Sequence, residues 1–548
     1  MRYLKFSILV LAMFAMLGGK WTTTPSADPS FGISGDVGNE ATLNALLNMV
    51  DVPLWAPGPR YYFSDATVGG GDFPAGNDSN TCLSPTKPCL TWTRADSICE
   101  GANCIFDAGE SFEYDTGEDF TTDWDYTTNR VAMTMRSSRP GVPFYVTYGT
   151  GSANAGVFHI DSSDAPGTGQ PYVLVLQDMH WKDWASASSR SAMAFDGDVI
   201  TIQNRVGCPD FVPTGSGQCW ELPGGRNVII NPIANMSENV AANPTQIMAI
   251  NEATHTTILG GVLQVDVDDA PNNNGNKLIL LGDAANTDTF LLSLIGTILR
   301  ADDSSTTSNI KLISGNEFSG LQTVRLARVS FQNATGINNN GGCLDLLMDS
   351  GHQQDFEIYQ STFENCSQAI QFTGADADAD NRLVMKYNIF EPSATTTDEV
   401  IRATADVFSL GTFIAEQNIV NEKGQDLAGL FTYLGGGGSV TDATVADFRT
   451  AVALESDPLK SNLDRFFTVA DTTAVTTSQF ASTCSTPAVA NMGICKCQQN
   501  QACFQAMAGA TYLAEVDIPA VLVNAMFGVD TDIHWIELGT EYSDYGAR

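Results

Sequence analysis

Short alternations of apolar and polar residues, separated by polar corners, run through the stretch from Phe356 to Phe372, FEIYQSTFENCSQAIQF. In the first alternation, Phe356 and Ile358 fall on one face, whereas Glu357 and Tyr359 fall on the other. Period-2 patterning interrupted by polar corners predicts several short strands. A helix is excluded because it would not bring the apolar residues of this stretch onto one face.

The same pattern recurs before and after this stretch. Its first apolar position steps by 32, 27 and 30 residues through Val324, Phe356, Leu383 and Phe413. A later apolar position takes the same steps through Phe331, Phe363, Phe390 and Val420. Self-similarity at a period of about 20 to 50 residues indicates a solenoid. Three short strands per coil predict an all-β parallel β-helix with three sheets, in which Phe331, Phe363 and Phe390 stack in one interior column.

Earlier coils are spaced less regularly, and loops are expected to interrupt them, for example over Gly207–Gly225. Loops on a solenoid tend to cluster on one face, which is often the binding face. The region from 180 to 280 is therefore expected to be rich in loops.

The chain is predicted to have four parts. Residues 1–27 are expected to be a secretory signal peptide, because Arg2 and Lys5 precede the apolar run Phe6–Leu17. Residues 28–59 are expected to form a linker and an N-terminal cap, residues 60–480 the β-helix, and residues 481–548 a Cys-containing insertion with a closing segment. No later stretch is long and apolar enough to span a bilayer, so we expect export to the extracellular space or the cell surface.

Acidic residues outnumber basic ones by 63 to 27, which leaves a formal net charge of −36. Nucleic acid is therefore not an expected partner, since phosphate binding needs a basic face. Most of this surface would also repel an acidic polymer. The simplest reading of the charge is solubility.

Twelve cysteines fit export to an oxidising compartment. Short spacings make Cys82–Cys89 and Cys208–Cys219 the expected local pairs, although spacing alone does not determine connectivity. The group from Cys484 to Cys503 contains four cysteines without a nearby histidine, so a zinc site there is the weaker alternative.

Several motifs occur in an order typical of one superfamily. They are the strand Tyr61–Phe63 with the Gly/Asp/Asn-rich loop after it, a short helix beginning within Pro88–Ala95, the strand Cys104–Phe106, the Gly/Pro-rich and Tyr-Gly turns of Arg136–Ile160, the stretch Ser456–Leu459, and the closing segment Tyr542–Ala547. From residue 60 to 548 the chain thus resembles secreted β-helix proteins of the pectate-lyase-like superfamily. The resemblance implies a right-handed parallel β-helix, but it says little about chemistry.

Polar residues of four coils are expected to form one outward ridge. Inward and outward positions alternate along a strand, so the residues between the apolar columns point outward. We call this set the outer ridge: Arg325, Glu357, Tyr359, Lys386 and Glu416. If the protein is an enzyme, Glu357, Lys386 and Glu416 are its candidate catalytic residues, and Arg325 and Tyr359 are candidates for binding substrate.

Two chemistries suit these residues, and each meets an objection. The backbones of Glu357 and Glu416 are expected about 12 Å apart from rung and strand spacing, which exceeds the range of an inverting glycosidase pair unless the side chains lean together. Lys386 would serve a lyase as a base, but two flanking carboxylates stabilise its charged form. The alternative is a solvated strand face with ordinary cross-strand charge pairs.

Calcium is the expected cofactor, if the protein has one. Asp376, Asp378 and Asp380 alternate within one loop, and hard cations need several carboxylate oxygens close together. A second Asp-rich loop lies at Asp266–Asp269. Neither loop matches the twelve-residue calcium hand, so a polar loop of an acidic protein is the competing interpretation.

Two functions follow from these observations. The first is a secreted protein that recognises a polysaccharide or cell-surface glycan along its outer groove and, in an enzymatic form, cleaves it by hydrolysis or elimination. The second is a non-catalytic surface adhesin or a tailspike-like fibre protein. The outer ridge favours the first, whereas the large negative charge and the lack of a clear catalytic constellation favour the second.

Overall fold

The computed structural model describes the chain in segments between residues 59 and 468. These are 59–64, 73–99, 104–108, 112–114, 132–138, 142–148, 158–160, 172–182, 184–185, 191–195, 199–212, 218–236, 246–250, 255–266, 276–282, 290–302, 310–315, 322–334, 342–347, 354–373, 382–386, 388–391, 399–403, 412–416, 418–420, 431–434, 439–443 and 466–468.

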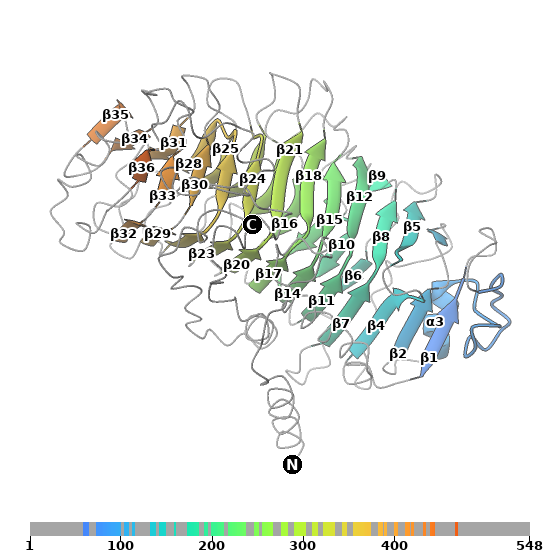
Figure 1. Ribbon diagram of the computed structural model, residues 1–548. Helices are drawn as coiled ribbons and strands as arrows, with labels where there is room; N and C mark the ends of the chain where they lie inside the picture. The colour runs from blue at the N-terminus through green and yellow to red at the C-terminus, as the bar shows by residue number, and fades with distance from the viewer. Residues whose placement is uncertain are drawn as a thin grey trace, which may run out of the picture.

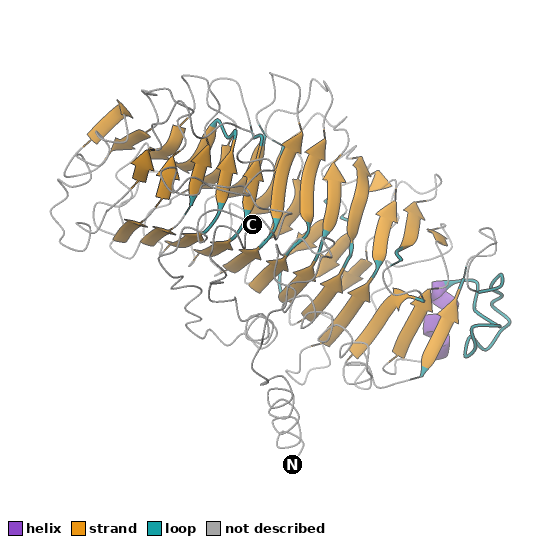
Figure 2. Ribbon diagram, in the orientation of Figure 1, coloured by secondary structure: helices purple, strands orange, loops and turns teal. Residues whose placement is uncertain are grey.

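These segments form a three-sheet parallel β-helix, so the predicted fold class is confirmed (Figures 1 and 2). From β4 to β34, each coil adds one strand to each sheet, and every named pairing is parallel except β34 with β35. The interior is lined by one continuous apolar cluster that extends from Tyr61 to Val420. Stacking is what buries these side chains, because a single coil has no partner for its apolar face.

The first sheet has twelve strands among the described residues. In spatial order they are β1 (Arg60–Phe63), β2 (Cys104–Ala108), β4 (Ala132–Ser137), β7 (Tyr172–Gln177), β11 (Val199–Asn204), β14 (Arg226–Ile230), β17 (His255–Leu259), β20 (Phe290–Ile295), β23 (Gln322–Ala327), β26 (Gln354–Tyr359), β29 (Arg382–Lys386) and β32 (Thr412–Glu416).

The second sheet has thirteen described strands. They are β3 (Phe112–Tyr114), β5 (Phe144–Tyr148), β8 (Met179–Lys182), β12 (Gly207–Val212), β15 (Ile233–Met236), β18 (Val262–Asp266), β21 (Ile298–Asp302), β24 (Ser330–Gln332), β27 (Thr362–Glu364), β30 (Ile389–Glu391), β33 (Asn418–Val420) and β36 (Phe466–Thr468), with β9 (Trp184–Ala185) beside β12.

The third sheet has eleven described strands. They are β6 (Phe158–Ile160), β10 (Met193–Phe195), β13 (Trp220–Leu222), β16 (Gln246–Ile250), β19 (Lys277–Leu281), β22 (Lys311–Gly315), β25 (Gly342–Leu347), β28 (Gln368–Thr373), β31 (Glu399–Ala403), β34 (Phe431–Leu434) and β35 (Ser439–Ala443).

The predicted coil register is confirmed. Phe356 pairs with Val324 on one side and with Leu383 on the other, and Leu383 pairs with Phe413 in turn. In the second sheet, the rings of Phe331 and Phe363 stack at 4.6 Å, and those of Phe363 and Phe390 stack at 4.9 Å. The three phenylalanines therefore form the interior column that the 27- to 32-residue steps predict.

The corner between the first and second sheets has a left-handed residue in seven successive coils. Its φ angle lies between 48° and 64° at Asp178, Arg205, Asn231, Gly260, Gly296, Arg328 and Gln360. The corner N–H donates to the strand end of the next coil, for example from Arg205 to the carbonyl of Ile230 at 2.8 Å. A residue other than glycine costs about 1 to 2 kcal/mol in this conformation. In most of these coils, the hydrogen bonds between successive corners must therefore offset this strain.

Polar residues also occur inside the solenoid. The Trp220 ring N–H donates to Gln203 at 2.8 Å, Gln203 donates to Thr201 at 3.1 Å, and the Thr201 hydroxyl donates to Asn227 at 2.8 Å. All four side chains are buried. The chain of hydrogen bonds satisfies groups that would otherwise be costly to bury.

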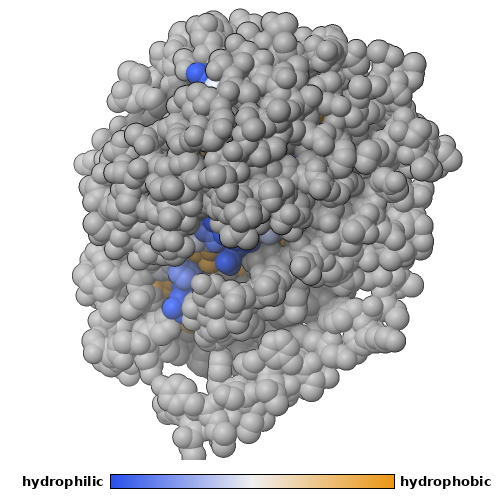
Figure 3. All heavy atoms as spheres, turned by 90° about the vertical axis from the view of Figure 1, so that its left-hand side faces the viewer, coloured by the Kyte–Doolittle hydropathy of each residue, from blue (hydrophilic) through white to orange (hydrophobic). Residues whose placement is uncertain are grey.

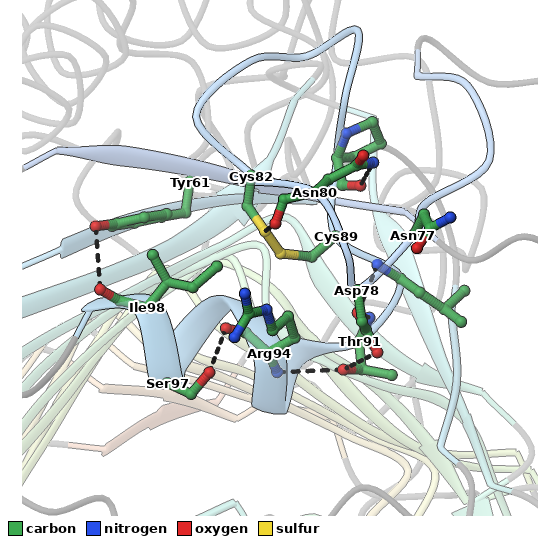
Figure 4. The surroundings of a disulfide bond; sticks show 12 residues. Tyr61, Asn77, Asp78, Asn80, Cys82, Cys89, Thr91, Arg94, Ser97 and Ile98 are labelled. Atoms are coloured by element: carbon green, nitrogen blue, oxygen red, sulfur yellow. Dashed lines mark hydrogen bonds between the residues drawn. A yellow bond between two sulfur atoms is a disulfide. The ribbon is translucent and has the colours of Figure 1, made fainter.

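The N-terminal coil carries the predicted short helix, α3 (Trp92–Cys99) (Figure 4). Asp78 accepts the backbone N–H groups of Leu90 and Thr91 at 2.9 Å each and the Thr91 hydroxyl at 3.0 Å. Thr91 in turn accepts the N–H of Arg94 at 3.2 Å, so it caps the helix N-terminus. These hydrogen bonds connect Asp78, in the described part of the loop that follows β1, to the start of the helix.

All eight cysteines within the described residues are paired. The pairs are Cys82–Cys89, Cys99–Cys104, Cys208–Cys219 and Cys343–Cys366. The two expected pairs are both present. The cysteines from Cys484 to Cys503 lie outside the described residues.

The expectation of a loop over Gly207–Gly225 is wrong in part. This stretch contains β12 and β13, and the Cys208–Cys219 disulfide joins β12 to the residue just before β13. Gly207 lies so close to the next coil that a Cβ there would meet the carbonyl oxygen of Ile233 at 1.9 Å. Gly207, which suggests a loop in the sequence, therefore lies in a strand and allows two coils to pack closely.

Candidate functional site

The outer ridge lies on the outer face of the first sheet, over β23, β26, β29 and β32. Arg325 pairs in register with Glu357, and Tyr359 pairs with Lys386, which pairs with Glu416. The ridge therefore occupies two neighbouring columns, as expected. Glu357 and Glu416 are two coils apart and in different columns.

Glu357 is engaged by two arginines. Arg382 on β29 donates a short hydrogen bond from its Nη1 atom to Glu357. The Nε atom of Arg325 on β23 lies 3.8 Å from the other Glu357 oxygen. The side chain of Glu357 is 12% exposed, so the pairing takes place largely out of solvent. Glu357 serves there as an acceptor between two cations.

Asp355 and Arg382 belong to the same site, although neither is among the predicted site residues. The Nη1 atom of Arg382 lies 2.6 Å from Asp355, and the two residues are in register on adjacent strands. We call Arg325, Asp355, Glu357 and Arg382 the charged cluster. Extending the outward alternation by one step towards the start of β26 and β29 would have found both missing residues.

Burial changes the acid–base properties of this face. It raises the pKa of Asp355 above its ordinary value, and the charge of Glu357 adds to the rise, whereas Arg382 opposes it. Burial also raises the pKa of Tyr359, and Glu357 again adds to the rise. Tyr359 therefore keeps its proton at neutral pH and is available as a hydrogen-bond donor.

The proposed chemistry of Glu357, Lys386 and Glu416 stays a prediction. The backbone register places Lys386 beside both Tyr359 and Glu416. The side chains of Lys386 and Glu416 lie outside the described part of the structure. Among the ridge residues whose side chains are described, Glu357 is held by arginines, which suits binding better than proton donation.

The calcium prediction also stays open, because Asp376, Asp378 and Asp380 lie outside the described residues. In the second Asp-rich loop, Asp266 is the last residue of β18 and pairs in register with Asp302. Within the described segments, no cluster of three or more His, Cys, Asp or Glu side chains is arranged to hold a metal ion.

Comparisons with known protein families, curated proteins and solved structures found no match. Among the described residues, no helix is long and apolar enough to cross a bilayer. Figure 3 views the molecule from the end where β32 and β35 lie, and it shows hydrophilic described residues directly beside hydrophobic ones on that side. The outer ridge and the charged cluster are therefore the features of the molecule that point to a function.

Proposed function

We propose that this protein is a secreted parallel β-helix protein that binds extracellular polysaccharide on the outer face of its first sheet. The observation that carries the proposal is the charged cluster, whose two arginines and two carboxylates lie on adjacent strands of a rigid sheet. Rigid strands hold donors and acceptors at fixed separations, which is what recognition of a repeating polymer requires. The four disulfides and the order of the motifs support export and a pectate-lyase-like relationship.

A neutral polysaccharide suits this site better than an anionic one. Two positive and two negative side chains make the charged cluster formally neutral, while the whole chain carries a net charge of −36. A polyanion would gain little at the cluster and would be repelled by the rest of the surface. Sugar hydroxyls both donate and accept hydrogen bonds, so they can use the guanidinium and the carboxylate groups together.

Arg382 is the group best placed to contact such a ligand. Its side chain is 38% exposed, compared with 12% for Glu357. Both of its ion pairs use Nη1, and a guanidinium has five N–H donors. Asp355 and Tyr359 lie on β26 beside it and would contribute an acceptor and a donor.

Binding is favoured over cleavage because of how the two carboxylates are held. Asp355 and Glu357 are two residues apart on one strand, and burial raises the pKa of Asp355. This is a feature of acid–base pairs in glycosidases. Here, however, both carboxylates bind the same nitrogen of Arg382, which stands where a glycosidic bond would have to enter.

A panel of neutral and anionic polysaccharides tests the proposal. We expect calorimetry to detect binding of a neutral polymer, with neither reducing ends nor unsaturated uronates released. Arg382→Gln should weaken binding about tenfold or more, because a hydrogen bond to a charged group contributes about 1.5 to 3 kcal/mol.

The matched control is Arg402→Gln. Arg402 is also an ion-paired arginine on an outward strand position, 3.3 Å from Glu399, but it belongs to the third sheet. Equal affinity of both variants would refute the site. Binding to no polysaccharide would favour the fibre or adhesin function. Release of sugar ends that Asp355→Asn and Glu357→Gln abolish would show that the face is catalytic.

A further inference from the structure

The outer face of the third sheet carries two lysines that the proposed function does not use. Lys277 begins β19 and pairs in register with Lys311, which begins β22, in the coils between β16 and β25 (Figure 1). Both lysines are partly exposed, whereas Leu278 and Ile279 beside Lys277 belong to the interior cluster. Successive coils lie about 4.8 Å apart, so two like charges are stacked in one outward column.

A single carboxylate serves the two lysines. The Nζ atom of Lys311 donates a short hydrogen bond to Asp345 on β25, and the side chain of Asp345 is only 7% exposed. Within the described part of the chain, Lys277 forms no ion pair with a carboxylate. The strand on its other side, β16, has no charged residue and faces Lys277 with Gln246. The three charged residues therefore carry one positive charge in excess.

The surroundings of Lys277 favour the neutral amine. Burial lowers the pKa of Lys277 below its ordinary value of 10.5, and the charge of Lys311 adds to the fall, whereas Asp345 opposes it. The neighbouring outward positions, Leu280 on β19 and Ala249 on β16, are apolar and offer no group that would stabilise an ammonium ion. A lysine next to a second cation and partly removed from water is an activated nucleophile.

We propose that Lys277 is a reactive amine that forms a Schiff base with aldehydes. Its nitrogen bonds to the carbonyl carbon, and the two hydrogens of the amine leave with the carbonyl oxygen as water, so that a C=N bond remains. The step needs no oxidant, reductant or cofactor. The open-chain reducing end of a sugar and a small aldehyde both present this carbonyl group.

Lys311 and Asp345 are positioning residues for this chemistry. Asp345 holds the Lys311 ammonium in place, and this fixed charge lies one coil from Lys277. A like charge disfavours the protonated form of its neighbour. The site lies on the third sheet, so it is independent of polysaccharide binding by the charged cluster on the first sheet.

Reductive trapping on the full chain tests the proposal. Glycolaldehyde and cyanoborohydride at pH 7 convert each Schiff base into a stable secondary amine, and peptide mapping by mass spectrometry gives the initial rate at each lysine. Lys277 should be labelled faster than Lys87, although Lys87 is the more exposed of the two. A reducing disaccharide in place of glycolaldehyde distinguishes the two sources of the aldehyde, and faster labelling of Lys277 by either one supports the proposal.

Two variants separate the effect of the like charge from that of access. Lys311→Met removes the charge and leaves Asp345 to pair with Lys277, so labelling of Lys277 at pH 7 should slow about tenfold for each pH unit by which its titration moves upward. Lys311→Arg is the matched control, because it keeps both the charge and the carboxylate partner. Lys277 should react in this variant as it does in the unaltered protein.

Trace acetylation, which modifies only the free amine, gives the titration of Lys277 in the unaltered protein. The rate at Lys277 should level off below pH 10.5, and a titration at or above this pH would overturn the proposal even if Lys311→Met does not fold. Labelling of Lys277 no faster than that of Lys87 would overturn it as well. So would an equal rate at Lys277 in folded Lys311→Met and Lys311→Arg.

Discussion

The stacked phenylalanines of the second sheet allow a quantitative test of the solenoid interior. Phe363 has an aromatic neighbour on both sides, at ring distances of 4.6 Å and 4.9 Å. Within this column, Phe331 and Phe390 each have one, because their other neighbours in the column are Leu299 and Val420. Replacing Phe363, Phe331 and Phe390 with leucine in turn therefore removes two, one and one of the stacked contacts of this column.

The three substitutions share one cost and differ in another. The three side chains are almost fully buried, so shrinking each one loses a similar transfer and cavity contribution. Each stacked aromatic pair adds about 0.5 to 1.5 kcal/mol beyond burial. Phe363→Leu should therefore cost about 0.5 to 1.5 kcal/mol more than Phe331→Leu or Phe390→Leu.

Native-state hydrogen exchange is the suitable assay, because a disulfide-linked solenoid is not expected to unfold in one step. The amides of β24, β27 and β30 report local opening around the column. In Phe363→Leu they should exchange about two- to tenfold faster than in either end variant. Equal exchange rates in all three variants would refute the contribution of stacking, although the column itself would remain.

Three further outcomes are expected. Trp220→Phe should destabilise the coils around β11 and β13 by about 1 to 3 kcal/mol, because the Gln203 oxygen loses its buried donor. Native-state hydrogen exchange of the amides in these strands measures this loss, and unchanged exchange rates would contradict it. Burial lowers the pKa of His180, so the unfolded chain binds a proton more readily than the folded protein. The free energy of unfolding should therefore fall as the pH drops below 6.5. His180→Gln should remove this contribution, and a pH profile that the substitution leaves unaltered would refute it. If Asp376, Asp378 and Asp380 bind calcium, adding calcium to chelator-treated protein should raise the melting temperature by mass action, and no shift would remove the proposal.

Much of the solenoid could be predicted from the order of apolar residues. Parallel coils pair equivalent positions, so the steps that connect Val324, Phe356 and Leu383 give their register directly. The same logic placed Arg325 beside Glu357. The pairs Cys82–Cys89 and Cys208–Cys219 followed from local spacing, and the short helix near Thr91 followed from the order of the motifs.

The charged cluster could be predicted only in part. Arg382 reaches Asp355 and Glu357 together, and this depends on the rotamer of a long side chain rather than on strand register. The left-handed corner is equally hidden, because arginine and glutamine occupy it at Arg205 and Gln360 as well as glycine elsewhere. Tertiary hydrogen bonds hold these residues in a conformation that their local preference disfavours.

The sequence by itself determined the repeat, the inward columns and the fold class, because the two-residue period and the coil length are properties of the chain alone. Only the tertiary structure decided which residues of the continuous apolar runs lie inside. Val228, Ile229 and Ile230 are all buried, yet Ile229 lines the solenoid while its neighbours lie on the outer face. A continuous run of apolar residues does not indicate which of its side chains point into the solenoid.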